Sequence, residues 1–162
     1  MFQSLESLRN TFAKNGRVEW LGVRPARDQP MQCLTSVQVL TSGMEGDRFS
    51  ACRSDKRTVT LIQHEHLAVL AKLLDVAQID PALTRRNIAV SGLNLLALKG
   101  ATFTLGSAVL QTTGLCHPCS KMERKLGLGA YNAMRGHGGI TARVLEPGTI
   151  SLGDPVTPQT VP

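Results

Sequence analysis

The sequence predicts a mainly β protein, built as a closed or nearly closed β-barrel with a few flanking helices. Three observations lead to this expectation. Short β-rich runs follow one another along the chain, Gly, Pro or Asp separates nearly all of them, and few segments have the periodicity of a long helix. The 162 residues are enough for one domain with its own core. Closure is expected because a barrel leaves no exposed sheet edge.

The expected strands are runs rich in β-branched and apolar residues, and all of them lie after Gly16. Turn residues between them are typical of short connections in an all-β domain. In chain order the strands are predicted over residues 18–23, 34–40, 58–62, 87–90, 101–105, 108–112, 140–145 and 149–152.

Helices are predicted in three places. Phe2, Leu5, Leu8 and Phe12 recur at helical spacing, which indicates an amphipathic helix that packs on the domain or on a second copy of the chain. Leucines share one face over residues 64–74, and a weaker helical pattern covers residues 118–134. We therefore expect a helical extension over residues 1–16, the barrel domain over 17–157, and a flexible tail over 158–162.

Composition limits the partners. A formal net charge of +6 and a pI near 9.6 indicate a ligand or partner with negative charge. Nucleic acid is disfavoured because aromatic residues are only 4% of the chain, too few for a stacking platform. No apolar run is long enough to span a bilayer, so no membrane association is expected. The cysteines at positions 33, 52, 116 and 119 do not form a secretory framework, and we expect a reducing cytoplasm.

The run Cys116-His117-Pro118-Cys119 is the most informative motif. Pro118 suits the first position of a helix, which would put Cys119 in the first turn, where the helix dipole favours a thiolate. Lys121 adds positive potential. A thiolate attacks electrophilic sulfur or binds a soft metal, whereas buried cysteines that only pack are the plain alternative.

The Cys-x-x-Cys spacing is also that of a redox dithiol or of half a zinc site. A thioredoxin-like motif should follow the first strand of a βαβ unit, but this one follows a hairpin pattern. His64 and His66 are two residues apart and would face different sides of a helix, where we expect capping and surface roles. Both readings are therefore disfavoured.

Two other polar groups interrupt apolar patterns. In the turn from Gly43 to Arg48, two glycines let the backbone approach a ligand, or Asp47 pairs with Arg48 and closes a tight loop. Before the strand at residues 87–90, Arg85 and Asn87 offer a guanidinium fork and an amide that match phosphate or carboxylate oxygens, although such a pair is often only solvated.

Taken in order, these pieces resemble the MOSC domain, the family named after the C-terminal domain of molybdenum cofactor sulfurase. The resemblance implies a β-barrel, a pocket for the molybdenum cofactor (molybdopterin) and, at the level of the family, pyridoxal phosphate binding. The fragments that carry it are Gly43-Met44-Glu45-Gly46-Asp47-Arg48, Arg57 to Ile62, Arg85-Arg86-Asn87-Ile88, Gly106 to Leu110, Pro118-Cys119 and Ala142 to Val156.

The resemblance also implies roles for residues. Cys119 matches the reactive cysteine of the family, as the residue that carries sulfur to the cofactor or as a molybdenum ligand. Arg85 and Asn87 match cofactor contacts, and Arg48 and Lys121 are further candidates for the same anionic ligand. Cys116, which many members lack, would resolve a persulfide on Cys119 or simply pack.

The function expected from the resemblance is sulfur transfer to the cofactor or molybdenum-dependent reduction of N-oxygenated compounds. The sulfur or the electrons would come from another protein, a cysteine desulfurase or an electron donor, because no desulfurase domain is recognised in this chain. A non-catalytic cofactor carrier is the main alternative, and a basic RNA-binding β-barrel is a third.

Overall fold

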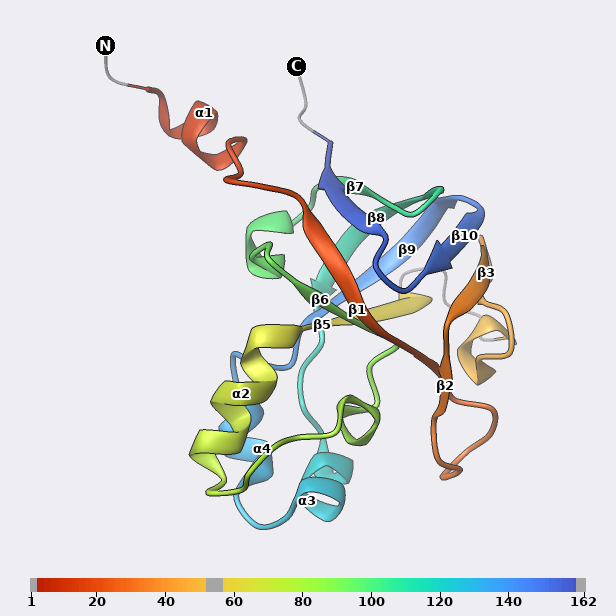
Figure 1. The fold of residues 1–162 in the computed structure, drawn as a ribbon, viewed down its shortest axis with the longest axis vertical. Coiled ribbons are helices and arrows are strands. Elements are labelled where there is room, and N and C mark those ends of the chain that lie inside the picture. The colour runs from red at the N-terminus through yellow and green to blue at the C-terminus, as the bar shows by residue number, and fades with distance from the viewer. Residues whose placement is uncertain (1–2, 52–56, 160–162) are drawn as a thin grey trace.

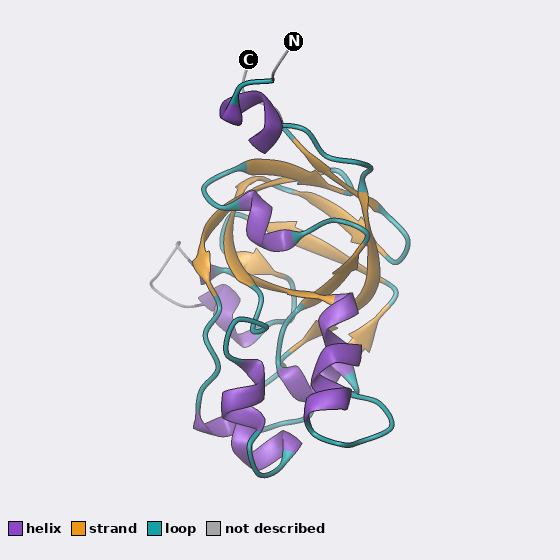
Figure 2. Ribbon diagram, turned by 90° about the vertical axis from the view of Figure 1, so that its left-hand side faces the viewer, coloured by secondary structure: helices purple, strands orange, loops and turns teal. Residues whose placement is uncertain are grey.

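The computed structural model describes residues 3–51 and 57–159, so Cys52 lies outside the described residues. Within them the chain is mainly β, with short helices at both ends of the barrel (Figures 1 and 2). The strands are β1 (Gly16–Val23), β2 (Gln32–Leu34), β3 (Ser36–Leu40), β4 (Gly43–Met44), β5 (Val59–Gln63), β6 (Ile88–Ser91), β7 (Thr102–Leu105), β8 (Ala108–Leu115), β9 (Ile140–Glu146), β10 (Gly148–Ser151) and β11 (Pro155–Pro158). The α-helices are α1 (Leu5–Arg9), α2 (His64–Leu73), α3 (Ser120–Leu126) and α4 (Ala130–Met134), and the 3₁₀ turns are η1 (Arg48–Ala51), η3 (Pro81–Thr84) and η4 (Leu95–Leu98).

The larger sheet closes on itself. Its strand order is β11-β7-β8-β9-β5-β6-β1-β2, and β11 also pairs with β1, which makes a barrel and leaves β2 as an appended strand. Only the β5–β6 pair is parallel within this sheet. A second sheet, in the order β10-β3-β4, lies beside the barrel. The predicted fold class, a closed β-barrel with flanking helices, is therefore confirmed, and the ring of strands is seen in Figure 2.

Two apolar clusters hold the molecule together. The interior of the barrel contains fully buried side chains such as Leu21, Leu61, Phe103 and Leu110. Each such side chain contributes roughly 1.5–3 kcal/mol through burial. A smaller cluster joins the outside of the barrel to the helices and includes Ile62, Leu67, Leu70, Ala89, Met122 and Met134. This second cluster fixes α2, α3 and α4 against one end of the barrel.

Most of the predicted strands are confirmed, but the structure differs at three points. The run 34–40 is split at Thr35, because β2 pairs with β1 in the barrel whereas β3 pairs with β10 in the small sheet. The two-residue β4 and the closing strand β11 were not predicted. β11 begins and ends with proline, which removes backbone donors and hides a strand from pattern reading. It includes Pro158 of the predicted tail, and residues 160–162 lie outside the described residues.

The helices also follow the predictions in part. The helix predicted over 64–74 is confirmed as α2. The weak pattern over 118–134 is two helices, α3 and α4, because Gly127 and Gly129 at positive φ interrupt it. At the N-terminus only α1 is helical, and Phe12 packs against the barrel core beyond it. In the described part of the chain no helix has both the length and the apolar character to cross a bilayer.

The two ends of the barrel carry different helices. α1 and the chain termini lie at one end, and α2, α3 and α4 lie at the other (Figures 1 and 2). We call the second one the thiol end, because Cys119 directly precedes α3 there.

Candidate functional site

Most of the predicted site residues meet in one cavity at the thiol end. Its volume is about 240 Å³. Lining residues come from the loop after β1, from η1, β5 and the segment before β6, and from the chain that leads into α3. They are Arg24, Arg48, Phe49, Thr60, Arg85, Arg86, Cys116, Cys119, Lys121 and Met122. Segments far apart in the sequence thus meet because the ends of several strands converge.

A second hollow of about 330 Å³ adjoins the first. Arg24, Phe49, Thr60, Cys116 and Cys119 line both, so the two form one branched site around the thiols. The second hollow adds residues of the opposite wall, namely Arg57, Leu115, His117 and Thr141.

Cys119 lies at the entrance of α3, but not in its first turn. The helix begins at Ser120, and Cys119 is the residue before it, with extended φ and ψ of −135° and 176°. The predicted helix start at Pro118 is therefore wrong. The carbonyl of His117, which a helix beginning at Pro118 would use as its first acceptor, accepts instead from Arg86. Cys119 is exposed, so its thiol is open to a ligand.

Arg86 holds the segment that carries the thiols. Its guanidinium is buried, and Nη2 donates to the carbonyl oxygens of Cys116 at 3.0 Å and His117 at 3.3 Å. Nε donates to Gly138 at 2.8 Å, and Nη1 donates to Thr84 at 2.8 Å. A planar fork with five donors suits this task, whereas a lysine cannot reproduce it. Arg86 is therefore a clamp between three chain segments.

Two glycines allow this close packing. A side chain on Gly138 would collide with the carbonyl of Cys116, and one on Gly139 would collide with the carbonyl of Leu61. Gly139 also has φ near +89°, which side chains rarely adopt. In return the Gly139 carbonyl accepts from the Cys116 amide at 2.9 Å. The Gly138-Gly139 pair thus lets the thiol segment lie directly against the barrel.

Beneath the cavity lies a buried network around Arg24. Its Nη2 donates to Asp47 Oδ2 at 2.7 Å, and its backbone amide donates to Asp47 Oδ1 at 2.7 Å. The prediction that Asp47 pairs with Arg48 is wrong, because the turn directs the carboxylate inward to Arg24. Arg48 and Arg24 instead both lie against the ring of Phe49, 5.2 and 4.4 Å from its centroid.

Asn87 belongs to the same network. Its side chain is fully buried, its Oδ1 accepts from Arg24 at 2.9 Å and from the Thr60 amide at 3.1 Å, and its Nδ2 donates to Gly22 at 3.1 Å. The oxygen and the nitrogen of the Asn87 side chain are thus both bound to protein groups, and Asn87 does not line the cavity. Asn87 therefore positions Arg24 and Thr60, and the direct ligand contact predicted for it is replaced by this supporting role.

Arg85 is held in an unusual backbone conformation. Its φ of 62° and ψ of 20° are left-handed, at the end of η3, and its Nη1 donates to the Gln29 carbonyl at 2.6 Å. A left-handed residue other than glycine costs roughly 1 kcal/mol or more, so the surroundings impose it. Burial, then the nearby charges of Arg24 and Arg48, lower the pKa of Arg85. A bound anion would relieve this repulsion.

The charge balance of the site is strongly positive. Two of the cations that line the cavity form ion pairs within the described residues. Arg24 pairs with the buried Asp47, and Lys121 lies 3.5 Å from the exposed Asp28. Arg86 forms no ion pair with a carboxylate in residues 3–51 and 57–159, and burial lowers its pKa while the neighbouring Cys116 and Cys119 act in the opposite direction. A buried cation without a carboxylate partner favours the binding of an anion nearby.

Other chemistries fit the site less well. In the described ranges no three His, Cys, Asp or Glu side chains gather as a metal site. The residues from Cys116 to Cys119 lie outside helix and strand and enter α3 extended, and the strand before them is antiparallel to both of its neighbours. This arrangement is not the βαβ context of a thioredoxin. His66 lies edge to face with His137, away from the cavity lining.

The sequence prediction missed Arg24, Arg57, Arg86 and Phe49. Arg86 stands between Arg85 and Asn87 in the sequence, and this position is the signal that could have indicated its role in the site. Nothing local marks Arg24, since its role comes from Asp47 and Asn87, which are distant in the sequence.

Comparisons with known proteins agree with this geometry. The family model of the MOSC domain matches residues 49–157. No curated protein sequence matches the chain. Among solved structures, the YuaD protein from Bacillus subtilis is similar with a TM-score of 0.80 at 20% identity, over 92% of this chain and 98% of that one.

Two further similar structures are YiiM proteins. The one from Geobacillus stearothermophilus has a TM-score of 0.72 at 18% identity, over 89% of this chain and 75% of its own. The one from Escherichia coli has a TM-score of 0.67 at 21% identity, over 90% and 71%. At these identities the likeness concerns the fold.

Proposed function

The chain belongs to the MOSC domain family, which is associated with molybdenum cofactor binding, and on this premise we propose that it binds the cofactor in the cavity at the thiol end. Cys119 would be the protein ligand of the metal. The observation that carries the proposal is the exposed Cys119 thiol in a cavity lined by cations and supported by the buried, carboxylate-free Arg86.

The residues present fit this group. The cofactor joins a soft metal centre to an anionic phosphate, and the cavity offers a soft thiolate beside several cations. Arg85, Arg48 and Lys121 would hold the anionic part, because their side chains line the cavity and none of them pairs with a buried carboxylate within residues 3–51 and 57–159. Arg86 and Asn87 would position the other residues of the site, since both are buried and hydrogen-bonded to protein groups.

For the reaction we favour molybdenum-dependent reduction of N-oxygenated compounds. When bound, the cofactor would supply two-electron redox chemistry at a metal with an open coordination position. The chain contributes a fixed base for the ligand: Arg86 and Gly139 bind the carbonyl and the amide of Cys116, three residues before Cys119, so the backbone that leads to Cys119 is anchored there. A metal ligand needs such fixation, whereas a sulfur carrier must reach two partners. Electrons would come from a donor protein.

Sulfur transfer to the cofactor is the second candidate, and a specific observation supports it. Cys119 is exposed and Cys116 lines the same cavity, so a persulfide on Cys119 would be open to a cysteine desulfurase and near a second thiol. Both reactions would take place in the reducing cytoplasm that the cysteine pattern predicts.

The test is expression of the full chain in a host that makes the cofactor, followed by molybdenum analysis and fluorescence of the oxidised pterin. We expect both in wild type, strong loss in Cys119→Ser, and no loss in Lys99→Ala, which replaces a cation at the opposite end of the barrel. Wild type without pterin would contradict the proposal.

Turnover separates the candidate reactions. The loaded protein is given a hydroxylamine-type substrate and a reduced viologen dye as electron donor. Oxidation of the dye that needs substrate supports reduction. Incorporation of persulfide sulfur from a cysteine desulfurase, without dye oxidation, supports sulfur transfer. Cofactor release to an acceptor protein, with neither activity, would make the chain a carrier.

A further inference from the structure

The helix α1 buries none of its residues against the described part of its own chain. It has five residues and none of them is buried, and Leu5 and Leu8 are 72% and 50% exposed. The ribbon shows it projecting from the end of the barrel (Figure 1). Its start is properly capped, because Ser4 Oγ accepts from the Ser7 amide at 3.0 Å. A helix of five residues is marginal in water by itself, and contact of its exposed leucines with another apolar surface would stabilise it.

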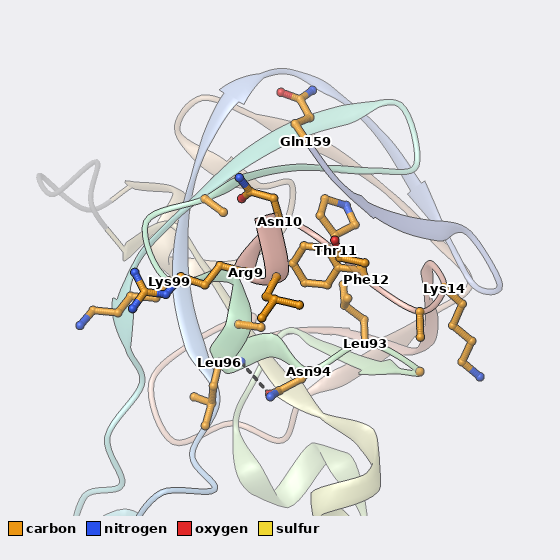
Figure 3. A pocket seen from close by; sticks show the side chains of 16 residues that line it. Arg9, Asn10, Thr11, Phe12, Lys14, Leu93, Asn94, Leu96, Lys99 and Gln159 are labelled. Atoms are coloured by element: carbon orange, nitrogen blue, oxygen red, sulfur yellow. Dashed lines mark hydrogen bonds between the residues drawn. The ribbon is translucent and has the colours of Figure 1, made fainter. Parts of the chain in front are cut away.

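A large hollow lies at the base of this helix. Its volume is about 870 Å³, larger than that of the thiol site, and its walls are the segment from Leu8 to Lys14, η4 and its flanks, and the end of β11. Figure 3 shows the ring of Phe12 and the side chain of Leu93 within it, and Arg9 and Lys99 at one edge. The lining includes three cations but no acidic residue. The hollow thus combines an apolar floor with a cationic rim.

We propose that a second copy of this chain covers this face, with the two α1 helices packed antiparallel about a two-fold axis. Leu5 and Leu8 are three residues apart and share one side of the helix, so they form a short apolar seam. Glu6 is the acidic residue of α1 and Arg9 is its basic one. In an antiparallel pair each Glu6 meets Arg9 of the other copy.

This charge pattern favours a copy over other occupants. An isologous interface needs one patch that complements itself, and a Leu5-Glu6-x-Leu8-Arg9 segment does so only when its direction is reversed. Lys99 adds a second cation at the edge where Glu6 of the other copy arrives. The hollow then receives the leucines, and the thiol end of each copy stays open at the far end of the barrel.

The experiment is light scattering coupled to size exclusion with the full chain over a range of concentrations. Wild type should elute with twice the 17.4 kDa mass of one chain. Leu5→Asp combined with Leu8→Asp should elute as a monomer with an unchanged circular dichroism spectrum, because both side chains are exposed in the single chain. Leu73→Asp is the matched control, since Leu73 is 58% exposed on α2 at the thiol end, and it should leave the dimer intact.

Charge reversal tests the antiparallel arrangement. Glu6→Arg and Arg9→Glu should each weaken the dimer, by roughly fivefold in the dissociation constant, and the double variant should regain affinity. A monomeric wild type at all concentrations, or a dimer that the leucine variants leave intact, would overturn the proposal. A monomer that binds an anilinonaphthalene sulfonate probe, and loses it with Lys99→Glu, would assign the hollow to an amphipathic anion instead.

The variants of Leu5, Glu6, Leu8, Arg9 and Lys99 lie away from the thiol end, so cofactor content should be unchanged in them. Failure of the dimer and failure of cofactor binding are therefore observed separately.

Discussion

The two ends of the barrel differ in what their cavities are made of. The hollow beside α1 is the larger, about 870 Å³ against 240 Å³, but its cations lie on a surface and support no buried network. The cavity at the thiol end is small, and its walls are fixed by buried ionic and hydrogen-bonded groups such as Arg24, Asp47 and Arg86.

The difference supports the proposal that the site lies at the thiol end. Burying Arg86 without a carboxylate is costly, and a fold retains such a group where its charge is used. At the α1 end the cations that line the hollow are exposed, so they carry no comparable cost of desolvation. The exposed leucines of α1 indicate contact with another apolar surface.

The largest expected effect is on stability at the thiol end. Asp47→Ala removes the carboxylate from a pair whose side chains are only 9% and 0% exposed, and it leaves Arg24 buried and unpaired. We expect a loss of about 3–5 kcal/mol in the free energy of unfolding, measured by urea denaturation. The control is Glu19→Ala, which removes the exposed partner of Arg17 and should cost about 0–1 kcal/mol. Equal losses of unfolding free energy in the two variants would show that the buried ion pair stabilises the fold no more than the exposed one.

The second prediction concerns the clamp. Arg86→Met puts an apolar side chain in place of the guanidinium and leaves the carbonyls of Cys116 and Gly138 without their donor. The loss should lower the free energy of unfolding by roughly 1–3 kcal/mol. Cofactor content should fall strongly, and Arg86→Lys should not restore it, because one ammonium cannot serve three segments. Full molybdenum content in Arg86→Met would show that the clamp does not position the site.

The third prediction compares two cations. Arg85→Ala should weaken cofactor retention by roughly 1–3 kcal/mol through the loss of charge-assisted hydrogen bonds. Lys99→Ala, at the other end, should change it little. The measurement is the amount of pterin that stays bound to the protein after dialysis against a chelator, which binds the molybdenum of any cofactor that is released. Loss from both variants in equal degree would mean that net charge, and not the site, determines retention.

A smaller effect is expected on thiol labelling. Cys33 and Cys119 are both exposed, whereas Cys116 is half-buried, so iodoacetamide should modify the first two faster. Cofactor loading should protect Cys119 several-fold and leave Cys33 unprotected, as followed by peptide mass spectrometry. Faster labelling of Cys116 than of Cys119 in the unloaded protein would contradict the assignment of the reactive cysteine.

The smallest effect is a dependence of stability on pH at the helices of the thiol end. Burial, and then the charge of His137, lower the pKa of His66 below its ordinary value of 6.5, and its Nδ1 is buried without a hydrogen bond in the described part of the chain. The unfolded chain therefore takes up the proton more readily. The contribution of His66 is present above pH 6.5 and is lost as pH falls from there through the lowered pKa. His66→Gln should flatten this decline in urea titrations, and an unchanged slope would refute it.

The sequence predicted the barrel because alternation and turn residues are local signals. Strand β11 is missed because prolines stand at both of its ends, although Val156 pairs with Leu105 of β7 and with Gly16 of β1, and the second pairing closes the barrel. At the site, Cys119 and Arg85 were found from short motifs. The role of Asn87 was not, because only the folded chain places it between Arg24 and Gly22. The start of α3 was misplaced for a similar reason, since the carbonyl that would begin it is bound by a distant arginine.

The most direct test of the central claim is X-ray absorption at the molybdenum edge on the loaded full chain. We predict that Cys119→Ser reconstituted with cofactor has one sulfur neighbour fewer at the metal than wild type, whereas Cys116→Ser has the same number as wild type. Loss of the sulfur neighbour in Cys116→Ser, or no change in either variant, would contradict the assignment of Cys119 as the metal ligand at the thiol end.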